Sequence, residues 1–493
     1  MIPVLLIAIP LLAGFTAFFI KNEKSVQGLA LLSSLATLVI SLLGLTVLKQ
    51  ADLLEHSSPW MSALGSSFSV KLDGMGQVFC LLNAVAYPLI FIATRNAKYR
   101  KANNFFAYML LTQAGMMGVF LAMDALLFYF FWELALIPAY FLCSQWGGDR
   151  KIQVTFKFFI YTFLGSLLML VGILFVFAKT PDHSFSLQSF YSAGASLNAG
   201  TQSWLFWLFF IAFAVKMPIF PFHTWQPDTY EQSSTAATMV LSGVMVKMGV
   251  LGIIRWLLPV LPIASYSWGD FVSSMAVTGM IYASLIAIRQ DDMKRLVAYS
   301  SIAHMGLMCL AIFSENKTGM QGVMIQVFNH GVNIIGLWIV VEIIERQYGT
   351  RKLSELGGLA QKAPAMAILF VTIAMANIAL PLTNGFIGEF LMFTGIFNSD
   401  VTRYNVWFTV LACICIILAA IYMLNMVRKI FYGETSNVTI AARDISLNEK
   451  LALGAIVILI FWFGVYPQVI LNITNEFSES ILKLSDVRHL IKK

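Results

Sequence analysis

The feature that most constrains this chain is a succession of apolar runs, each about as long as a lipid bilayer is thick. A hydrocarbon core of about 30 Å requires about 20 apolar residues in a helix, and about 14 such runs follow one another here. The runs have helical length and no alternation of polarity, whereas the strands of a membrane barrel would be about 10 residues long. The sequence therefore predicts an all-α polytopic membrane protein with spans near 2–20, 26–48, 75–95, 105–123, 124–146, 154–178, 204–226, 234–258, 271–289, 294–314, 319–345, 364–398, 405–430 and 449–471.

The composition supports a lipid environment. Hydrophobic residues make up 59% of the chain and charged residues only 12%, whereas a soluble domain has about 25% charged residues. The net charge of +7 is divided among short clusters between runs, so no basic face for nucleic acid is expected. The five cysteines lie inside apolar runs without metal or redox spacing, so we expect no metal and no cofactor in this chain.

Basic residues indicate the orientation of the spans. Only five of them fall in the even-numbered joints, namely Lys49, Lys71, Lys179, Lys317 and Arg403. The odd-numbered joints carry the remaining loop lysines and arginines and should therefore be cytoplasmic. Both termini are then expected outside. The first run has no basic segment before it and no clear cleavage site, so it should be a retained span.

Six ionisable residues lie in the middle of spans. Each charged group costs about 2.5–3.5 kcal/mol at the bilayer centre, so such residues are functional candidates. They are Glu133, Lys216, Lys247, His304, His330 and Glu389. Lys157 and Arg255 lie nearer to span ends and are expected to extend toward the interface.

Two spans carry helix breaks beside these residues. Pro218 and Pro221 interrupt AVKMPIFPFHTWQPDTY, and Pro381 interrupts ANIALPLTNGFIGEF. Proline removes a backbone hydrogen bond, and in lipid the freed carbonyl groups need water or polar partners. The two breaks are five spans apart, in spans 7 and 12. This spacing predicts two inverted five-helix repeats, spans 4–8 and 9–13, with the site between them.

The repeats divide the chain into four predicted parts. Residues 1–104 would hold spans 1–3, residues 105–258 the first repeat, residues 259–432 the second, inverted repeat, and residues 433–493 the last span and the tail.

The buried groups suggest a path for protons. Burial disfavours the charged form of a lysine and a nearby carboxylate restores it, so Glu133 is expected to control the proton on Lys216. Histidine titrates near neutral pH and has two ring nitrogens for relay. We expect the proton to pass from Lys216 along Lys247, His304 and His330 to Glu389. Entry from the cytoplasm is expected near His223, Asp228, Tyr230 and Glu231.

Six motifs carry a family resemblance. They are FFWELALIP, AFAVKMPIFPFHTWQPD, LSGVMVKMGVLGIIR, RLVAYSSIAHMG, FNHG and NGFIGEF. Over nearly its whole length the chain resembles the antiporter-like membrane subunits of respiratory complex I, the NADH:quinone oxidoreductase. The resemblance implies that Glu133 and Lys216 form the pump pair, that Lys247 and His304 are relays on the central axis, and that Glu389 is the terminal station. His330 is carried over as a further relay.

The resemblance also implies surroundings. NADH, FMN, iron–sulfur clusters and quinone would bind in partner subunits, and the partners would include the antiporter-like subunits L and N and small membrane subunits. The location would be a bacterial inner membrane, with both termini on the periplasmic side. Subunits L and N look to have lysine where this chain has Glu389, and subunit L continues into a long lateral helix, so a third paralogue is indicated.

The chain departs from the family pattern after the broken span. The family usually reads LPDAHxxAPTA where this chain reads QPDTYEQSSTA, so Tyr230 replaces a histidine and Ser234 replaces a proline. A histidine-based entry gate is therefore in doubt.

Three other functions remain open at this stage. A D-type subunit of a multisubunit Na⁺/H⁺ antiporter would share the lysine and glutamate pattern, and co-purification with flavin and iron–sulfur subunits would distinguish it. A haem protein with His304 and His330 as ligands is disfavoured by lysines and carboxylates at the same depth. A passive scaffold has no reason to bear the cost of buried charges.

Overall fold

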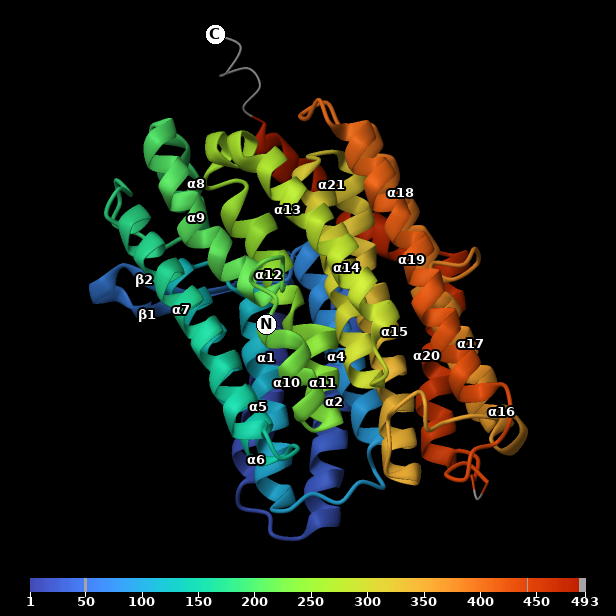
Figure 1. Ribbon diagram of the computed structural model, residues 1–493. Coiled ribbons are helices and arrows are strands. Elements are labelled where there is room, and N and C mark those ends of the chain that lie inside the picture. The colour runs from blue at the N-terminus through green and yellow to red at the C-terminus, as the bar shows by residue number, and fades with distance from the viewer. Residues whose placement is uncertain (48–50, 441, 487–493) are drawn as a thin grey trace.

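The computed structural model describes residues 1–47, 51–440 and 442–486. Helices run roughly side by side through most of the molecule (Figure 1). Their bounds are α1 Ile2–Ala17, α2 Glu23–Thr46, α3 Ala51–Leu54, α4 Gly74–Ala93, α5 Ala102–Leu121, α6 Ala125–Gln145, α7 Lys151–Phe177, α8 Leu187–Ser196, α9 Ala199–Lys216, α10 Trp225–Gln232, α11 Thr235–Val240, α12 Lys247–Leu251, α13 Pro262–Arg289, α14 Met293–Phe313, α15 Lys317–Tyr348, α16 Leu359–Lys362, α17 Pro364–Asn377, α18 Asn384–Phe397, α19 Asn405–Phe431, α20 Leu447–Val465 and α21 Gln468–Ser485.

The predicted all-α membrane architecture is confirmed. Within the described ranges, twelve helices are long and apolar enough to cross a membrane, and the segment Thr235–Leu257 counts as one of them. The shorter α1 and the pair α17 and α18, taken as one interrupted span, bring the number to the predicted fourteen. The inverted symmetry of the two repeats and the four-part division stay predictions.

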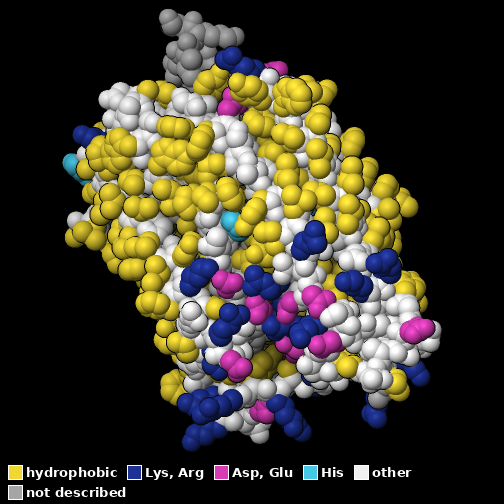
Figure 2. Space-filling model, viewed as in Figure 1, with side chains coloured by type: hydrophobic (Ala, Val, Ile, Leu, Met, Phe, Trp, Pro, Cys, Tyr) yellow, Lys and Arg dark blue, Asp and Glu magenta, His cyan; other side chains and the backbone are white. Residues whose placement is uncertain are grey.

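The helices differ in what covers them. α14 and α15 are buried on nearly all sides, whereas α7 and α19 leave apolar side chains such as Phe156, Leu164 and Ile417 exposed. Figure 2 shows a broad hydrophobic band over the molecule, with charged side chains gathered toward its lower end. A helix buried all round is a core element, and an exposed apolar face is suited to lipid or a partner helix. We call the lower end, where the joints with Arg150 and Arg351 lie, the charged end.

One joint contains strands that the all-α prediction omitted. β1 (Glu55–Met61) and β2 (Ser66–Lys71) form an antiparallel hairpin. Asp124 secures the hairpin to the helices, because its carboxylate accepts hydrogen bonds from Ser66 Oγ at 2.8 Å and Ser67 N at 3.0 Å. The same carboxylate caps the start of α6.

Both predicted helix breaks are confirmed. In span 7, α9 ends at Lys216 and α10 begins at Trp225, so Pro218 and Pro221 lie in the gap. In span 12, α17 ends at Asn377 and α18 begins at Asn384, with Pro381 between them.

Polar side chains satisfy backbone groups at these breaks. Trp225 Nε1 donates to the carbonyl oxygen of Val215 at 2.9 Å. In the second break, Asn329 Nδ2 donates to the carbonyl oxygen of Asn384 at 2.7 Å. Val215 lies in the last turn of α9, where carbonyl oxygens have no intrahelical donor, so the Trp225 bond supplies a partner that lipid cannot.

Span 8 has an irregularity that the sequence did not predict. Two π-helical segments, η2 (Leu241–Met245) and η3 (Gly252–Leu257), flank the short α12. π-Helical turns are rare and occur often at functional sites. They place Lys247 and Arg255 on widened turns or directly beside them.

Candidate functional site

Four of the six predicted mid-span residues form a continuous chain of contacts. Lys247 Nζ lies 2.9 Å from His330 Nδ1, and the rings of His330 and His304 are 5.2 Å apart between centroids. His304 Nδ1 lies 3.2 Å from Glu389 Oε1. All four residues are buried. The chain runs from α12 through α15 and α14 to α18.

The order of the two histidines corrects the sequence prediction. We expected Lys247 to be followed by His304, whereas His330 is its neighbour and His304 contacts Glu389. The depth of a residue in a span can be read from the sequence, but the direction in which its side chain points depends on how the helices are rotated.

A small cavity adjoins the far end of this chain. Its volume is about 20 Å³, and His304, Asn377, Glu389 and Tyr422 contribute to its lining. One water molecule needs about 10–15 Å³ of such space and two or more polar partners, so the cavity is suited to a single water. Tyr422 Oη also donates to Ser300 Oγ at 3.0 Å. Tyr422 and Glu389 thus line the same small cavity.

Lys216 is buried beside this chain but is not bonded to it. Its Nζ atom has no hydrogen-bond partner among the described residues and lies over the rings of Trp132 at 5.5 Å and Phe158 at 6.0 Å. Aromatic faces attract cations, and the attraction grows when water is excluded. The backbones of spans 7 and 8 meet near it, since a Cβ atom on Gly249 would lie 2.6 Å from the carbonyl oxygen of Phe213.

Glu133 lies apart from Lys216 in this structure. No ion pair within 4 Å joins the two among the described residues, and Glu133 Oε1 has no hydrogen-bond partner there. Glu133 is half-buried at a groove of about 340 Å³ lined by apolar side chains that include Trp60 and Phe130. The pairing of Glu133 with Lys216 therefore stays a prediction, and the structure has the two groups separated.

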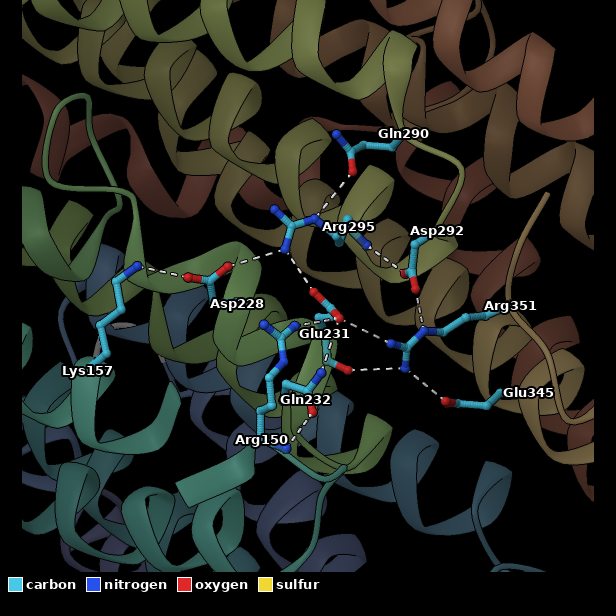
Figure 3. A network of polar contacts seen from close by, with 10 residues as sticks. All are labelled: Arg150, Lys157, Asp228, Glu231, Gln232, Gln290, Asp292, Arg295, Glu345 and Arg351. Carbon is cyan, nitrogen blue, oxygen red and sulfur yellow. Dashed lines mark hydrogen bonds and ion pairs between the residues drawn. The ribbon is translucent and has the colours of Figure 1, made fainter. Parts of the chain in front are cut away.

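Two of the four predicted entry residues belong to a network of charges at the charged end (Figure 3). Asp228 contacts Lys157 Nζ at 2.8 Å and Arg295 Nη1 at 3.2 Å. Glu231 contacts Arg295 Nη1 at 2.8 Å and Arg150 Nη2 at 3.2 Å. Burial alone would raise the pKa of Asp228, but the charges and hydrogen bonds of Lys157 and Arg295 outweigh it and hold that pKa below its ordinary value.

The network extends from α10 to α14 and α15. Arg351 bonds to Asp292, and its Nη1 donates to Glu345 Oε1 at 3.1 Å. Lys294 Nζ lies 2.7 Å from Glu345 Oε2. Since Arg351 also donates to the carbonyl oxygen of Glu231 at 3.2 Å, the network connects α10 with the start of α14 and the end of α15.

The other two predicted entry residues are buried. Tyr230 is fully buried between the rings of Trp225 and Trp338. His223 packs against Phe220 and Tyr282. The structure therefore separates the four predicted entry residues into a charged pair at the surface and an aromatic pair below it.

A polar pocket at the charged end was missed by the sequence reasoning. It has a volume of about 220 Å³ and is lined by Glu231, Thr235, Lys294, Glu342, Glu345 and Arg351, among others. Thr235 Oγ1 donates to Glu345 Oε2 at 3.4 Å, at the start of span 8.

Hydroxyl groups lead from that pocket into the span. Ser242 Oγ donates to the carbonyl oxygen of Thr238 at 2.8 Å, and Lys247 Nζ donates to the carbonyl oxygen of Ser242 at 2.7 Å. Positions three or four apart share one helix face. The hydroxyl residues of TAATMVLSGVMVK were the signal for this polar stripe.

Arg255 corrects a second expectation. Its side chain does not extend to the interface, because it is fully buried. Arg255 Nη2 contacts both carboxylate oxygens of Asp73 at 2.6 Å, and Nη1 donates to the carbonyl oxygen of Phe120 at 2.7 Å. The pair joins η3 to the start of α4 and the end of α5. Asp73 is 182 residues away in sequence, so no local pattern could reveal it.

The site geometry disfavours the haem alternative. His304 and His330 contact Glu389 and Lys247 through their Nδ1 atoms, and their rings lie too close together for a porphyrin between them. Among the described residues, no cluster of three or more histidine, cysteine, aspartate or glutamate side chains could hold a metal ion.

Comparisons with known proteins agree on one family. Residues 122–418 match the family model described as NADH:quinone oxidoreductase/Mrp antiporter, TM. The NADH-quinone oxidoreductase subunit M of Rickettsia typhi is 34% identical over 479 residues, which cover 95% of this chain and 96% of the relative.

Solved structures show the same fold. A chain of respiratory complex I from Thermus thermophilus, solved with bound NADH, superposes with a TM-score of 0.91 and 26% identity over 99% of this chain and 100% of that one. A chain of the Mrp complex from a Dietzia species has a TM-score of 0.84 at 18% identity, over 98% of this chain and 99% of that one. The latter likeness concerns the fold alone.

Proposed function

The chain belongs to the NADH:quinone oxidoreductase/Mrp antiporter family of membrane subunits, and from this premise we propose how a proton crosses it. It is a proton-translocating membrane subunit, similar in length and sequence to relatives named NADH-quinone oxidoreductase subunit M. The proposed path consists of Lys216, Lys247, His330, His304 and Glu389, with Glu133 as the carboxylate that controls Lys216. The observation that carries the proposal is the contact chain from Lys247 through both histidines to Glu389.

Protons would enter through the polar pocket at the charged end. Its floor leads to Thr235, Thr238 and Ser242, and the last of these accepts a hydrogen bond from Lys247 through its carbonyl oxygen. Asp228 and Glu231 would hold the broken helix beside this mouth, while the buried His223 and Tyr230 would lie deeper on the entry route. The breaks at Pro218, Pro221 and Pro381 would admit water at the two ends of the path.

The proton would then move between named atoms. Lys247 Nζ would donate to His330 Nδ1, and His304 Nδ1 would donate to Glu389 Oε1. The Nε2 atoms of both histidines have no hydrogen-bond partner among the described residues, so they are available to pass a proton from one ring to the other through a water or a ring rotation. Histidine suits this step because its two nitrogens can bind and release a proton near neutral pH.

Lys216 would act as the switch of the path. An approach of Glu133 favours the charged ammonium, and its withdrawal favours release of the proton toward Lys247. Lys216 is almost completely buried beside the rings of Trp132 and Phe158, so the charge on Lys216 would respond strongly to that one carboxylate.

The redox chemistry would occur elsewhere in a larger complex. NADH, FMN, iron–sulfur clusters and quinone would bind in other subunits, and this chain would contact the antiporter-like subunits L and N and small membrane subunits. It would lie in a bacterial inner membrane with both termini on the periplasmic side. A D-type subunit of a multisubunit Na⁺/H⁺ antiporter is the second candidate, favoured by the likeness in fold to the Mrp complex.

The test replaces Lys216 with methionine in the assembled complex, reconstituted into liposomes. We expect proton pumping coupled to quinone reduction to fall by about 10²-fold or more, the usual effect of removing a proton-transfer group. NADH oxidation by an artificial electron acceptor should stay normal. Lys362→Met, at an exposed lysine of α16, is the matched control. Undiminished pumping by the Lys216→Met complex rejects the path, and absence of flavin and iron–sulfur subunits from the purified complex selects the antiporter.

A further inference from the structure

A separate pocket lies at the charged end between α2, α4 and α5. Its volume is about 410 Å³, and its lining includes Lys24, Gly28, Leu31, Phe91 and Arg95. Gln27, Asn96 and Phe106 complete it. None of these residues belongs to the proton path, so the pocket requires its own explanation.

The side chains on both walls of the pocket change from basic at its mouth to apolar in its interior. On α2, exposed Lys24 is followed by Gly28 and Leu31, which lie one and two turns deeper on the same face. On α4 the same gradient runs the other way along the chain, because Phe91 lies one turn deeper than exposed Arg95. The pocket is therefore cationic at its mouth and hydrophobic inside.

The packing around α2 is looser at the charged end than at its opposite end. At the opposite end of α2, a Cβ atom on Gly44 would lie 2.7 Å from Leu72 Cδ2, so the contact there is close. At Gly28, a Cβ atom would have no neighbouring heavy atom within 4 Å. The absence of a side chain at Gly28 therefore leaves the space open.

The basic groups at the mouth are available for a ligand. Among the described residues, neither Lys24 nor Arg95 takes part in an ion pair within 4 Å. Asn96 Nδ2 makes a long contact of 3.4 Å with Ser446 Oγ. Two cations and an amide face outward above a cavity with aromatic and aliphatic walls.

We propose that this pocket binds an anionic phospholipid. The phosphate lies between Lys24 and Arg95, and one acyl chain extends along Leu31, Phe91 and Phe106. Basic pockets between membrane helices on the cytoplasmic side are suited to acidic headgroups, and each basic residue near an anionic lipid contributes about fivefold in affinity. A free phosphate would satisfy the mouth but would leave the apolar interior without a partner. An apolar helix of another subunit would fill the interior but would leave both cations unpaired.

The experiment uses the assembled complex in lipid nanodiscs that contain phosphatidylglycerol or phosphatidylcholine with a photoactivatable acyl chain. Mass spectrometry of the cross-linked peptides measures the labelling of Leu31, Phe91 and Phe106. We expect phosphatidylglycerol to label the pocket and phosphatidylcholine to label it far less. The double variant Lys24→Gln/Arg95→Gln should weaken phosphatidylglycerol binding by about 25-fold. The double variant Lys362→Gln/Lys429→Gln, at basic residues remote from the pocket, should leave it unchanged.

Further arms distinguish the occupants. Gly28→Leu keeps both charges and fills the interior, so it should abolish labelling by the acyl chain. Excess inorganic phosphate should not displace the lipid, and displacement would identify a phosphate site instead. Equal labelling by the two lipids, no labelling of the pocket, or full labelling of the Lys24→Gln/Arg95→Gln complex would each overturn the proposal.

Discussion

Individual residues matter here mainly through burial of their charge. Lys247 and Arg255 lie in the same irregular span and are both fully buried, but their partners differ. Lys247 contacts a histidine and a carbonyl oxygen, neither of which carries a full negative charge at neutral pH. Arg255 contacts a carboxylate through two short bonds. The first arrangement leaves the proton transferable, and the second is a permanent structural ion pair.

A prediction follows for the structural pair. Removal of one partner from a buried ion pair costs about 3–5 kcal/mol because the other charge is left without compensation. Asp73→Asn should be the worse change, since it strands a wholly buried guanidinium. Arg255→Met should be milder, because the Asp73 side chain is 18% exposed and can be hydrated. The midpoint of thermal disassembly of the purified complex measures both effects. Equal losses would contradict this ranking.

The depth of the buried residues was predictable, but their partners were not. Apolar context alone placed six ionisable side chains in mid-span, because a charge in lipid is costly enough to stand out. The order of His304 and His330 was wrong and Arg255 was misassigned, because both depend on helix rotation and on contacts between distant segments. A single sequence gives the position of a residue along a span, but it does not give the rotation of the helix about its axis, which sets where the side chain points.

At the scale of elements, α15 and α18 meet at a point that permits no side chain. A Cβ atom on Gly395 would lie 2.3 Å from the Cα and N atoms of Gly319. Since α18 carries Glu389 and α15 carries His330, this crossing limits how far apart the two helices that carry these residues can lie.

Gly395→Ala should therefore force the two helices apart. Backbone atoms cannot move aside as a side chain can, and overpacking of this kind costs about 1–3 kcal/mol. We expect lower thermal stability and a larger proportional loss of proton pumping. Gly454→Ala is the matched control, because a Cβ atom there has no neighbour within 4 Å. A complex with Gly395→Ala that is as stable and as active as the control would disprove the close crossing.

The charge network at α10 predicts a response to acid. The pKa of Asp228 is lowered in the folded chain, whereas an unfolded aspartate titrates at about 3.9. Its contribution to stability is therefore complete above about pH 3.9 and is lost as the pH falls through the lower folded value. The side chain is about one-third exposed, so the contribution should stay below about 1 kcal/mol.

Asp228→Asn should remove this contribution at pH 7 and reduce the further loss on acidification. Thermal disassembly of the complex measured between pH 7 and pH 3 checks the effect. A parallel displacement of the variant and parent curves over that whole range would count against it.

The two helix breaks could be predicted from the sequence, whereas the π-helical segments and the β-hairpin could not. Prolines marked both breaks, since proline cannot donate the backbone hydrogen bond of a helix. Proline alone does not end a span, however, because Pro88 and Pro138 lie inside the continuous α4 and α6. The π-helical segments of span 8 had no such marker, since LSGVMVKMGVLGIIR contains no proline and its apolar residues surround the helix. The hairpin in the joint before α4 was missed because the prediction was restricted to helices.

The whole molecule was the most predictable scale. Fourteen spans and a helical membrane architecture follow from bilayer thickness and from the obligation to satisfy backbone groups in lipid. Most predicted bounds lie near the observed ones, but α13 begins at Pro262 rather than at 271, and α9 ends at Lys216 rather than at 226. The distribution of basic residues also predicts the orientation of the spans in the membrane. Labelling of introduced cysteines by a membrane-impermeant reagent can test it.

We expect the joint before α5 to face the cytoplasm and the joint before α8 to face the periplasm. Lys98→Cys should react with a membrane-impermeant maleimide only after the membrane is opened or inverted, and Asp182→Cys should react in intact cells. Among the native cysteines, Cys413 is exposed on the apolar face of α19 and the other four are buried, so background labelling should be low. Reaction of Lys98→Cys in intact cells would contradict the predicted orientation and support the opposite one.

The widened turn before Lys247 affects which mutations can test the contacts of this lysine. Ser242 lies inside η2, and the group that receives the Lys247 hydrogen bond is its main-chain carbonyl oxygen. Replacement of the serine side chain removes the hydroxyl of the polar stripe but leaves that acceptor in place, so an alanine scan of the span would report only on the hydroxyl. Only a change to the main chain itself would remove the carbonyl oxygen that accepts the Lys247 hydrogen bond. Deletion of one residue from Leu241–Met245, which should restore a regular helical turn, is such a change.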